Sequence, residues 1–415
     1  MATDLRDKLR QLGVTKGAAK IKPKPHRGQS IQPFLEGQEI ESLAGKAFVV
    51  EECYTLDHLH GNTKLAAFLE QPATVAAQLA YDSALADIDL GRCVFLDTET
   101  TGLSSGTGTL AFLVGIGSLR DAAFCVRQFF LRDPDEEPAM LAALSDSVAD
   151  CQAIVTFNGR GFDLPLLQTR YILAQMHPTW LARPHLDLLM PARRMWRDRL
   201  PSRALSSLEV HILGVQRTQD DVPGYLIPQM YLDYLQTGDA SEMPRVMYHN
   251  QQDILSMVTL AARLCRMFAD PLADESFDPA DLVSLAKWYD DLGMEALAER
   301  AFHAVLERKM DWTARVAALA RLGFMLKRQN RRQEAVAVWE QLAQVGDANV
   351  MAHIELAKHF EWHAGDPGRA LAWAHAAQEI IATWPPGYIQ EQAGAEIAHR
   401  LERLERKHSI VERRK

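Results

Sequence analysis

The chain has 415 residues, of which 47% are hydrophobic and 24% are charged, a composition that predicts a globular protein of about two to three domains. This composition excludes collagen-like, disordered and disulfide-scaffold proteins. The sequence contains no run of about 18 consecutive apolar residues, so we expect no transmembrane helix. The formal net charge of −9 is unevenly distributed: residues 1–30 carry +6, residues 400–415 carry +4 and the rest carries −19. Since a globally acidic protein is a poor non-specific binder of nucleic acid, the two basic ends stand out.

Residues 1–45 mix Lys, Gly, Pro and Gln without a sustained apolar period, which predicts a basic, flexible N-terminal arm. The opening MATDLRDKLRQ carries charges where a signal peptide would need an apolar segment, so we expect a cytoplasmic protein with no membrane partner. Residues 46–90 combine a strand-like run at 46–56 with an Ala/Leu-rich, helix-like stretch at 63–90. We expect this segment to pack as an extension on the domain that follows.

The cysteines lie tens of residues apart, with no CxxC pair and no Cys/His cluster at zinc spacing. We therefore predict reduced, mostly buried thiols. The five residues are Cys53, Cys93, Cys125, Cys151 and Cys265.

Residues 91–270 alternate between strand-like and helix-like patterns. Three strand-like runs come first, and helical segments then alternate with a further apolar strand. This order predicts an α/β domain in which a mixed sheet is flanked by helices. The strands are expected at residues 92–100, 110–119, 123–131 and 153–159, and the helices at 136–150 and 163–176.

Residues 280–405 are rich in Ala, Leu, Glu and Arg and contain three copies of one helical pattern, spaced 37 and then about 34–35 residues apart. The spacing resembles that of tetratricopeptide repeats, which are paired helices, although only Leu322-Gly323 approaches the expected Leu-Gly pair. We predict an all-α helical-repeat domain whose surface could dock a protein partner or guide a substrate. The copies lie at 286–302, 321–339 and 355–374.

Asp97 and Glu99 end the strand predicted at 92–100. Alternate strand residues point to the same face, so the two carboxylates lie close together, where they repel each other and are poorly solvated. A divalent cation between them would offset that cost, and all-oxygen coordination favours Mg²⁺ or Mn²⁺. The pair alone is a weak signal for a metal site.

Three motifs resemble those of the DEDD superfamily of 3′–5′ exonucleases, which have a ribonuclease H-like fold. The run DTETTGL at 97–103 resembles the first motif. The second motif joins an Asn to an Asp, and the run FNGRGFD supplies Asn158 and Asp163. The third places an Asp on a helix, and the run YHNQQDILSM supplies Asp253. Together the three motifs, in the expected order, are a specific match.

The third motif departs from the two patterns of the superfamily, in which the Asp follows a Tyr at x3 spacing or a His at x4 spacing. Here Tyr248 stands at the His spacing and His249 at the Tyr spacing. Residues four apart on a helix share a face, so His249 lies beside Asp253, whereas Tyr248 is turned about 100° farther away. His is also the better general base near neutral pH. We predict His249 as the general base, with Tyr248 as the alternative.

Residues 90–265 also resemble the YprB-type branch of ribonuclease H-like proteins, in segments such as HLDLLMPARRMW and LSSLEVHILG. The resemblances imply a nuclease in which two Mg²⁺ or Mn²⁺ ions activate water and stabilise the leaving oxygen, while His249 takes the proton of the water. They do not imply a particular substrate. The implied metal ligands are Asp97, Glu99, Asp163 and Asp253.

The expected partner is nucleic acid, in particular a single-stranded 3′ end, with RNA and DNA equally open. The basic run at 193–199 with its tryptophan would suit phosphate contacts and base stacking, although a solvated helix face explains it equally well. The basic ends of the chain are further candidates for phosphate contacts. The residues expected to bind substrate are Thr100, Thr101, Gly102, Leu103, Asn158, Arg193, Arg194 and Trp196.

Two other acidic residues have competing interpretations. Asp187 could be a fifth metal ligand, but a strand end that caps the helix at 188–197 explains it more simply. Glu209 fits a capping box with Ser206, so we expect it to start a helix.

The whole chain has competing interpretations as well. A non-catalytic scaffold could bind nucleic acid through the nuclease fold and recruit partners through the repeats. An endonuclease is a third option, since a fold does not fix the polarity of cleavage. The intact set of four carboxylates favours an enzyme, a divalent-metal 3′–5′ exonuclease or another nuclease of that fold, over the scaffold, because a pseudo-enzyme usually loses at least one of them.

Overall fold

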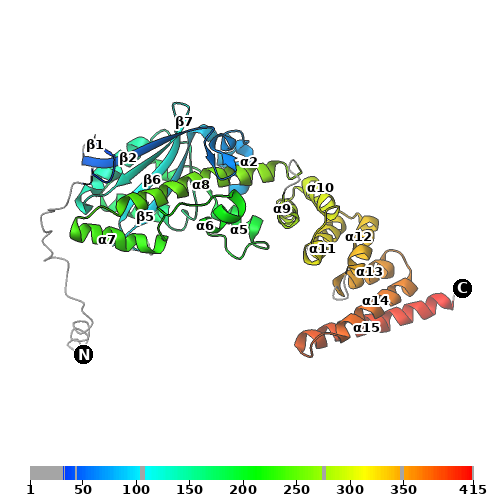
Figure 1. The fold of residues 1–415 in the computed structure, drawn as a ribbon. Helices are drawn as coiled ribbons and strands as arrows, with labels where there is room; N and C mark the ends of the chain where they lie inside the picture. The colour runs from blue at the N-terminus through cyan, green and yellow to red at the C-terminus, as the bar shows by residue number, and fades with distance from the viewer. Residues whose placement is uncertain are drawn as a thin grey trace, which may run out of the picture.

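The computed structural model describes residues 31, 33–42, 44–102, 108–272, 277–345 and 350–413. Within them, an N-terminal α/β domain is followed by a row of helices that extends away from one side of it (Figure 1). Leu103 and the basic arm at 1–30 lie outside the described residues. In the ranges given above, no helix combines the length and apolar character needed to cross a membrane.

A seven-stranded sheet forms the centre of the α/β domain. Its order is β1-β2-β7-β6-β5-β8-β9; β5, β8 and β9 run parallel, and the other neighbours are antiparallel. This confirms the predicted mixed sheet. The strands are β1 (Gln38–Ser42), β2 (Gly45–Thr55), β5 (Cys93–Thr100), β6 (Ala111–Arg120), β7 (Ala123–Phe130), β8 (Ala153–Thr156) and β9 (His185–Asp187), while β3 (Leu59–His60) and β4 (Thr63–Lys64) form a small separate hairpin.

The main helices that cover the sheet are α2 (Ala73–Ala80), α3 (Glu137–Ser147), α4 (Asp163–Leu173), α5 (Leu189–Trp196), α7 (Ile227–Thr237) and α8 (Met243–Ala269). They form two layers. Phe95 of β5 belongs to the core made with α2, α5 and α8, whereas its neighbour Leu96 belongs to the core made with α3, α4 and α7. Because side chains alternate along a strand, Asp97 and Glu99 continue on the α8 side and Thr98 on the α4 side.

One prediction about the start of the chain is wrong. Residues 38–42, assigned to the flexible arm, form β1, which pairs with β2 along its whole length. The helix-like stretch at 63–90 forms several short helical segments around α2, because Pro72 precedes α2 and Tyr81 ends it in the left-handed conformation (φ 55°). The strand predicted at 46–56 is confirmed as β2.

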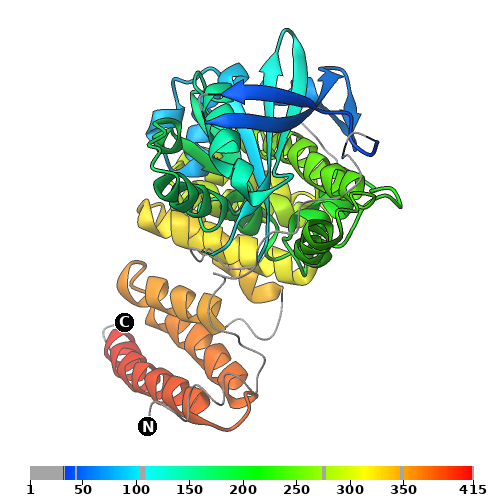
Figure 2. The ribbon, with the colours of Figure 1, turned by 90° about the vertical axis from the view of Figure 1, so that its left-hand side faces the viewer.

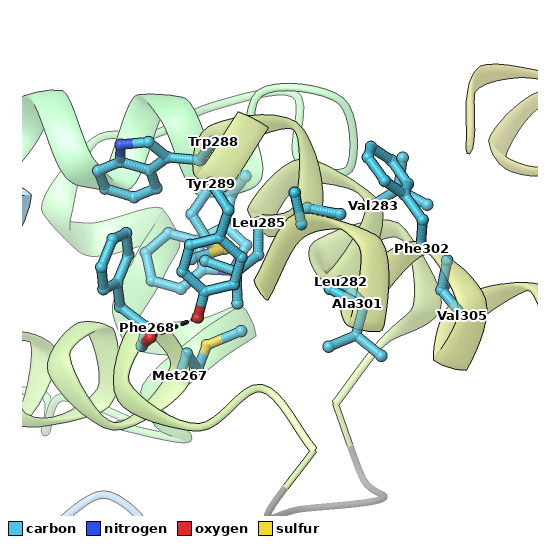
Figure 3. Packing of buried hydrophobic residues seen from close by; sticks show 14 of the residues in the cluster. Met267, Phe268, Leu282, Val283, Leu285, Trp288, Tyr289, Ala301, Phe302 and Val305 are labelled. Atoms are coloured by element: carbon cyan, nitrogen blue, oxygen red, sulfur yellow. Dashed lines mark hydrogen bonds between the residues drawn. The ribbon is translucent and has the colours of Figure 1, made fainter. Parts of the chain in front are cut away.

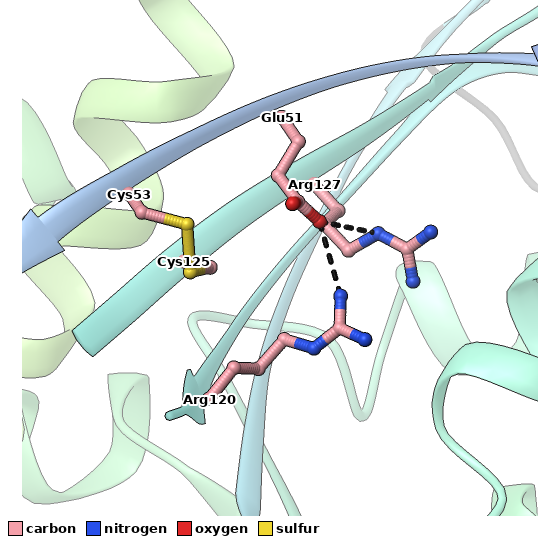
Figure 4. The surroundings of a disulfide bond; sticks show 5 residues. All are labelled: Glu51, Cys53, Arg120, Cys125 and Arg127. Carbon is pink, nitrogen blue, oxygen red and sulfur yellow. Dashed lines mark hydrogen bonds and ion pairs between the residues drawn. A yellow bond between two sulfur atoms is a disulfide. The ribbon is translucent and has the colours of Figure 1, made fainter. Parts of the chain in front are cut away.

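One pair of cysteines forms a disulfide. Cys53 of β2 and Cys125 of β7 are directly opposite in the antiparallel register, with 4.0 Å between their Cα atoms, and their sulfurs are bonded (Figure 4). The prediction of reduced thiols is therefore wrong for these two residues, because strand pairing joins positions that are 72 residues apart. Cys93, Cys151 and Cys265 are free and buried, as predicted.

The C-terminal region described here is entirely helical, and successive helices pack against each other (Figure 2). The strongest packing joins α9 with α10, α11 with α12, α13 with α14, and α14 with α15. These pairs match the helical repeats predicted from the sequence. The helices are α9 (Pro279–Asp291), α10 (Glu295–Leu306), α11 (Trp312–Arg328), α12 (Arg332–Gln344), α13 (Val350–Trp362), α14 (Pro367–Ala382) and α15 (Tyr388–Glu412).

An aromatic core anchors α9 to the α/β domain. Phe268 at the end of α8 packs edge-on against Trp288 and Tyr289 of α9, with ring centroids 5.1 and 5.0 Å apart (Figure 3). The Tyr289 hydroxyl also donates to the Phe268 carbonyl oxygen. All three side chains are buried. The first repeat helix is therefore packed directly on the α/β domain.

A buried carboxylate holds the last helix of the row. The Glu361 side chain of α13 is completely buried and accepts hydrogen bonds from Arg400, Arg403 and Lys407 of α15, at 2.8–3.0 Å. Burial opposes its charge, but the bonds from Arg403 and Lys407 outweigh this and lower the pKa of Glu361 to about 2. Three of the cationic side chains predicted to make the C-terminal tail basic thus contact one buried carboxylate, which offsets one of their charges within the fold.

We expect Glu361→Gln to destabilise the repeat domain by about 3 kcal/mol at neutral pH, because each unit of pKa shift corresponds to about 1.4 kcal/mol. A carboxyl with a lowered pKa stabilises the fold above its ordinary pKa of 4.5, and this contribution is lost as the pH falls towards 2. Urea unfolding should therefore show a difference between variant and wild type that shrinks below pH 4.5. Glu340→Gln, which removes a more exposed partner of Arg369, should change stability by less than about 1 kcal/mol. Equal effects of the two substitutions would contradict this assignment.

Candidate active site

The carboxyl end of β5 meets α4 and α8 at one edge of the sheet. β5 carries Asp97 and Glu99 on the side that faces α8, and α8 carries His249 and Asp253. The β8–α4 loop leads to Asp163, which begins α4 as predicted. Since β5 and β8 are parallel, their carboxyl ends lie at the same edge. The structure therefore brings the predicted carboxylates and the predicted base together from three elements.

Asp97 and Glu99 occupy an environment that disfavours their charged forms. Burial raises the pKa of Asp97 well above its ordinary value, and the charges of Asp253 and Asp163 raise it further. Burial likewise raises the pKa of Glu99, and the charge of Asp97 adds to the effect. A cluster of this kind is stabilised by positive charge placed close to it.

A hydrogen-bonded chain fixes the orientation of Asp97. Asn250 Nδ2 of α8 donates to Asp97 Oδ2 at 2.8 Å, and Asn250 Oδ1 accepts from Gln128 Nε2 of β7 at 2.9 Å. Gly115 of β6, which is paired with Asp97, makes room for this contact, because a Cβ there would lie 2.0 Å from Asn250 Oδ1. The sequence motifs identified neither Asn250 nor Gln128, whose roles depend on the packing of α8 across β6 and β7.

Asp163 approaches from the other helical layer. Its Oδ1 accepts a hydrogen bond from Thr98 Oγ1 at 2.5 Å. Burial raises the pKa of Asp163 to about 6, although the hydrogen bond from Thr98 opposes this shift. In this arrangement Asp163 is directed at Thr98, and no three His, Cys, Asp or Glu side chains in the described ranges already form a metal-ligand group.

A buried arginine, Arg217, carries positive charge into the site. It donates to Asp253 Oδ1 and, through two nitrogens, to both carboxylate oxygens of Glu209. Although burial opposes its charge, Asp253 and Glu209 raise the pKa of Arg217. Glu209 also accepts from Ser256 Oγ at 2.6 Å. Glu209 does begin a short helical segment, Glu209–Leu213, but the predicted capping box is wrong: Ser206 lies inside the preceding helix, Leu205–Leu208, and the Glu209 carboxylate is a buried partner that positions Arg217.

His249 has one ring nitrogen turned to the carboxylates and the other turned away. Nε2 lies 3.8 Å from Asp253 Oδ2 and 4.0 Å from Glu99 Oε1. Nδ1 lies 2.8 Å from Asp221 Oδ1 and 3.2 Å from a terminal nitrogen of Arg217. An ionised carboxylate can only accept a hydrogen bond and a guanidinium can only donate one, so these two contacts favour opposite tautomers; the shorter contact, with Asp221, favours a proton on Nδ1. The Nε2 of the neutral ring then faces the site as an acceptor.

Tyr248 is engaged elsewhere. Its hydroxyl accepts a hydrogen bond from the backbone N–H of Thr218 at 3.2 Å, in the irregular segment that also carries Asp221. The helical spacing correctly predicted that His249 and Asp253 lie on one face of α8. It gave no signal for Asp221 or Arg217, because neither lies on a regular element or in a recognised motif.

The loop after β5 uses the hydroxyl groups that were predicted to contact substrate. Thr100 Oγ1 donates to the Gly102 carbonyl at 2.7 Å, and Thr101 Oγ1 accepts from the Leu110 N–H at 3.0 Å. In the structure both hydroxyl groups are therefore engaged with backbone groups of Gly102 and Leu110. Leu103, the fourth residue predicted for this loop, lies outside the described residues.

Asp187 organises the adjoining loop and the start of α5. Its Oδ1 accepts from the backbone N–H groups of Asn158 and Leu189, at 2.8 and 3.0 Å, and its Oδ2 accepts from that of Arg160 at 3.0 Å. The capping role is thus confirmed, and the carboxylate is occupied by backbone donors. Asn158 itself is exposed, with a φ of 69°, so its side chain is accessible beside the site.

The basic helix α5 has one face in solvent and one in the core. Arg193 and Arg194 are exposed, whereas Trp196 is 0% exposed and belongs to the core cluster. The prediction that Trp196 stacks on a base is therefore wrong. The helix is amphipathic, and Trp196 follows Ala192 and Met195 on its buried side.

The donor set at the β5 edge fits a hard divalent cation. It is rich in carboxylate oxygens, the ligands that Mg²⁺ and Mn²⁺ prefer. Arg217 lowers the pKa values of Asp97 and Glu99, but its effect is outweighed by burial and by the neighbouring carboxylates. One guanidinium shared with Glu209 and Asp253 therefore leaves the cluster short of positive charge.

Comparison with known proteins gives two results that agree with this geometry. Residues 94–265 match the family model described as RNase_H superfamily. The protein titled "Uncharacterized protein YprB" from Bacillus subtilis (strain 168) is 30% identical over 393 residues, which covers 91% of this chain and 91% of that protein. The matched domain spans β5 through most of α8, and so contains all of the residues just described at the carboxyl end of β5.

Proposed function

Because this chain belongs to the same family as YprB and carries a nuclease-like domain of the RNase_H superfamily, we propose that it is a 3′–5′ exonuclease that hydrolyses phosphodiester bonds of DNA or RNA. The observation that carries the proposal is the meeting of four carboxylates at the carboxyl end of β5. Two come from the strand itself, one from the start of α4 and one from α8. They are Asp97, Glu99, Asp163 and Asp253.

These four side chains would hold two Mg²⁺ or Mn²⁺ ions, which supply a water of lowered pKa and positive charge at the leaving oxygen. Asn250 keeps one oxygen of Asp97 in a fixed direction through its 2.8 Å hydrogen bond. Thr98 holds Asp163 at the edge of the site. For Asp163 to serve as a ligand, its carboxylate must share or leave the hydrogen bond with Thr98.

His249 is the proposed general base. Asp221 holds Nδ1 and thereby selects the tautomer whose Nε2 accepts a proton. Nε2 is directed at the space between Glu99 and Asp253, where a water bound to the carboxylate cluster would lie. Arg217 fixes Asp253 from the opposite side of that carboxylate.

The repeats support a further part of the proposal. We infer that α9–α15 form tetratricopeptide-like helical hairpins that either guide the substrate or dock a protein partner. Their paired packing and their spacing in the sequence support this.

The proposal is tested with purified protein, end-labelled single- and double-stranded DNA and RNA, and added Mg²⁺ or Mn²⁺. We expect stepwise shortening from the 3′ end of single strands, and complete loss of activity when a chelator is added. Internal cuts would show that the protein is an endonuclease of the same fold and not an exonuclease. Tight binding without hydrolysis under any metal condition would instead identify a nucleic-acid-binding scaffold. Hydrolysis that persists in the chelator would contradict the metal-dependent mechanism.

A further inference from the structure

A second hollow lies where the α/β domain meets the first repeat helices. It has a volume of about 690 Å³ and is lined by residues of α2, α5, α9 and α11 and of the β8–α4 loop. Its walls therefore come from both domains. The packing of α9 on Phe268 and on α5 holds the two walls together. We call this hollow the junction cavity.

The junction cavity is strongly basic in a chain whose net charge is −9. Seven cationic side chains and three carboxylates line it, a balance of +4. One of the carboxylates, Asp187, is already occupied by three backbone N–H groups. The cationic residues are Arg160, Arg193, Arg194, Arg197, Arg203, Lys287 and Arg321.

Part of this charge lacks a counter-charge within the protein. Among the described residues, no carboxylate forms an ion pair with Arg160 or Arg193, and both side chains are exposed. Arg197 has only a 3.5 Å contact with Asp198, which Lys287 shares at 3.3 Å. These exposed cations lie around one hollow, so they would attract a ligand that carries several regularly spaced negative charges.

The junction cavity is connected to the carboxylate site by one short loop. Arg160 lies in the loop that leads from β8 to Asp163, and its backbone N–H is held by Asp187 at the end of β9. Helix α5, with Arg193, begins directly after β9. Since β5, β8 and β9 are parallel, all of these groups lie at the same edge of the sheet. A ligand could therefore extend from the carboxylates past Arg160 into the cavity.

The same wall presents apolar surfaces at which bases could pack. Tyr81 is 58% exposed and Met190 is 64% exposed, and both line the cavity. The Tyr81 hydroxyl accepts a hydrogen bond from Trp288 Nε1 at 2.8 Å, and the Arg194 guanidinium lies 5.7 Å from the centre of its ring. An aromatic ring held beside a row of cations is the arrangement with which proteins bind single-stranded nucleic acid without sequence preference.

We propose that the junction cavity binds the sugar–phosphate backbone of a single strand, upstream of the 3′ end that occupies the carboxylate site. The inference rests on the proposed nuclease function, and it assigns substrate binding to α9 and α11 of the repeat domain as well as to α5. An acidic protein segment would satisfy the cations but would have no use for the exposed ring of Tyr81. The nucleic-acid strand uses both features.

The test measures binding in the absence of divalent metal, so that it does not depend on hydrolysis. Fluorescence anisotropy would compare 5′-labelled single strands of about 20 and about 5 nucleotides, because only the longer one reaches beyond a single binding site of typical size. We expect Arg193→Ala/Arg197→Ala to weaken binding of the long strand about tenfold and binding of the short strand less, because the short strand makes fewer phosphate contacts. For the long strand, the negative slope of log affinity against log salt should become less steep by about 1.4, which is about 0.7 for each lost phosphate contact.

The matched control is Arg92→Ala/Arg183→Ala. It removes the same charge from exposed arginines at the amino ends of β5 and β9, on the opposite edge of the sheet. We expect it to leave both affinities unchanged. Equal losses in the two double variants, or an unchanged affinity in the cavity variant, would overturn the proposal. The proposal would also be overturned if poly-glutamate displaced the labelled long strand as effectively as an unlabelled strand of equal charge.

Tyr81 gives a second, independent arm. Tyr81→Phe removes the hydrogen bond with Trp288 but keeps the ring, so it should bind the long strand normally, whereas Tyr81→Ala should lose about tenfold. Equal losses of affinity in these two variants would show that stacking on the Tyr81 ring does not contribute to binding. A hydrolysis assay in Mg²⁺ distinguishes failure of the proposed nuclease function from failure of the cavity assignment. A wild-type protein that binds through the cavity but never hydrolyses would overturn the proposed function and leave the cavity assignment standing.

Discussion

Asp97→Asn should abolish hydrolysis and, in metal-free buffer, make the protein more stable to heat. The loss of activity should reach about three orders of magnitude, because a metal ligand contributes several kcal/mol to the transition state and each 1.4 kcal/mol is tenfold in rate. The gain in stability follows from the raised pKa of Asp97, which reflects burial and repulsion by Asp253 and Asp163. The amide is neutral and can still accept the hydrogen bond from Asn250.

Thermal unfolding with and without Mg²⁺ provides a readout besides activity. Wild-type protein should be stabilised by Mg²⁺, since a ligand that binds only the folded state raises the midpoint of unfolding. The Asp97→Asn variant should lose most of that increase. Asp146→Asn, an exposed carboxylate on α3, should behave as wild type in both assays. A variant that is less stable than wild type without metal would contradict the view that Asp97 is held under electrostatic strain.

The sequence predicted the parts of the site that local patterns encode. Asp97 and Glu99 end an apolar strand, and strand alternation alone places them on one face. Asp163 begins α4, and helical spacing places His249 beside Asp253. Each of these positions depends on a few neighbouring residues. The order of strand-like and helix-like runs likewise predicted the mixed sheet.

The parts that the sequence did not predict depend on contacts between distant segments. Arg217 reaches Asp253 from 36 residues away, and Gln128 reaches Asn250 from a strand 122 residues away. Glu209 matched a local capping pattern, yet its carboxylate is buried against Arg217 and Ser256. The residue pattern of a capping box occurs in many sequences without forming a cap, whereas a buried carboxylate must be paired. Tertiary packing therefore decides whether Glu209 caps a helix or pairs with Arg217.

The uneven charge of the chain also has a structural explanation. Acidic residues gather at the carboxyl end of β5, and basic residues gather in the junction cavity beside it. At the C-terminal end, the positive charge of Arg400, Arg403 and Lys407 is engaged with Glu361 inside the repeat domain. The junction cavity, rather than this part of the tail, is therefore the stronger described candidate for phosphate contacts.

His249→Ala should lower the rate of hydrolysis by about 10²–10⁴, the usual contribution of a general base. Tyr248→Phe should remain within a few-fold of wild type, because the Tyr248 hydroxyl only accepts a hydrogen bond from the Thr218 N–H. The two residues are adjacent on α8, so Tyr248→Phe controls for disturbance of that helix. Single-turnover rates in saturating Mg²⁺ would measure the chemical step. The reverse ranking would assign proton transfer to Tyr248.

Asp221→Asn tests how His249 is positioned. The Asp221 carboxylate accepts from Nδ1 and so keeps Nε2 free to take a proton, whereas an amide can turn its NH₂ group to Nδ1 and favour the opposite tautomer. We expect a loss of about 10–100-fold in rate, as for other residues that orient a catalytic side chain, with little change in substrate affinity. In the His249→Ala background the same substitution should have almost no further effect, because a positioning residue acts only through the side chain that it positions. Full additivity of the two losses would show that Asp221 acts on the reaction independently of His249.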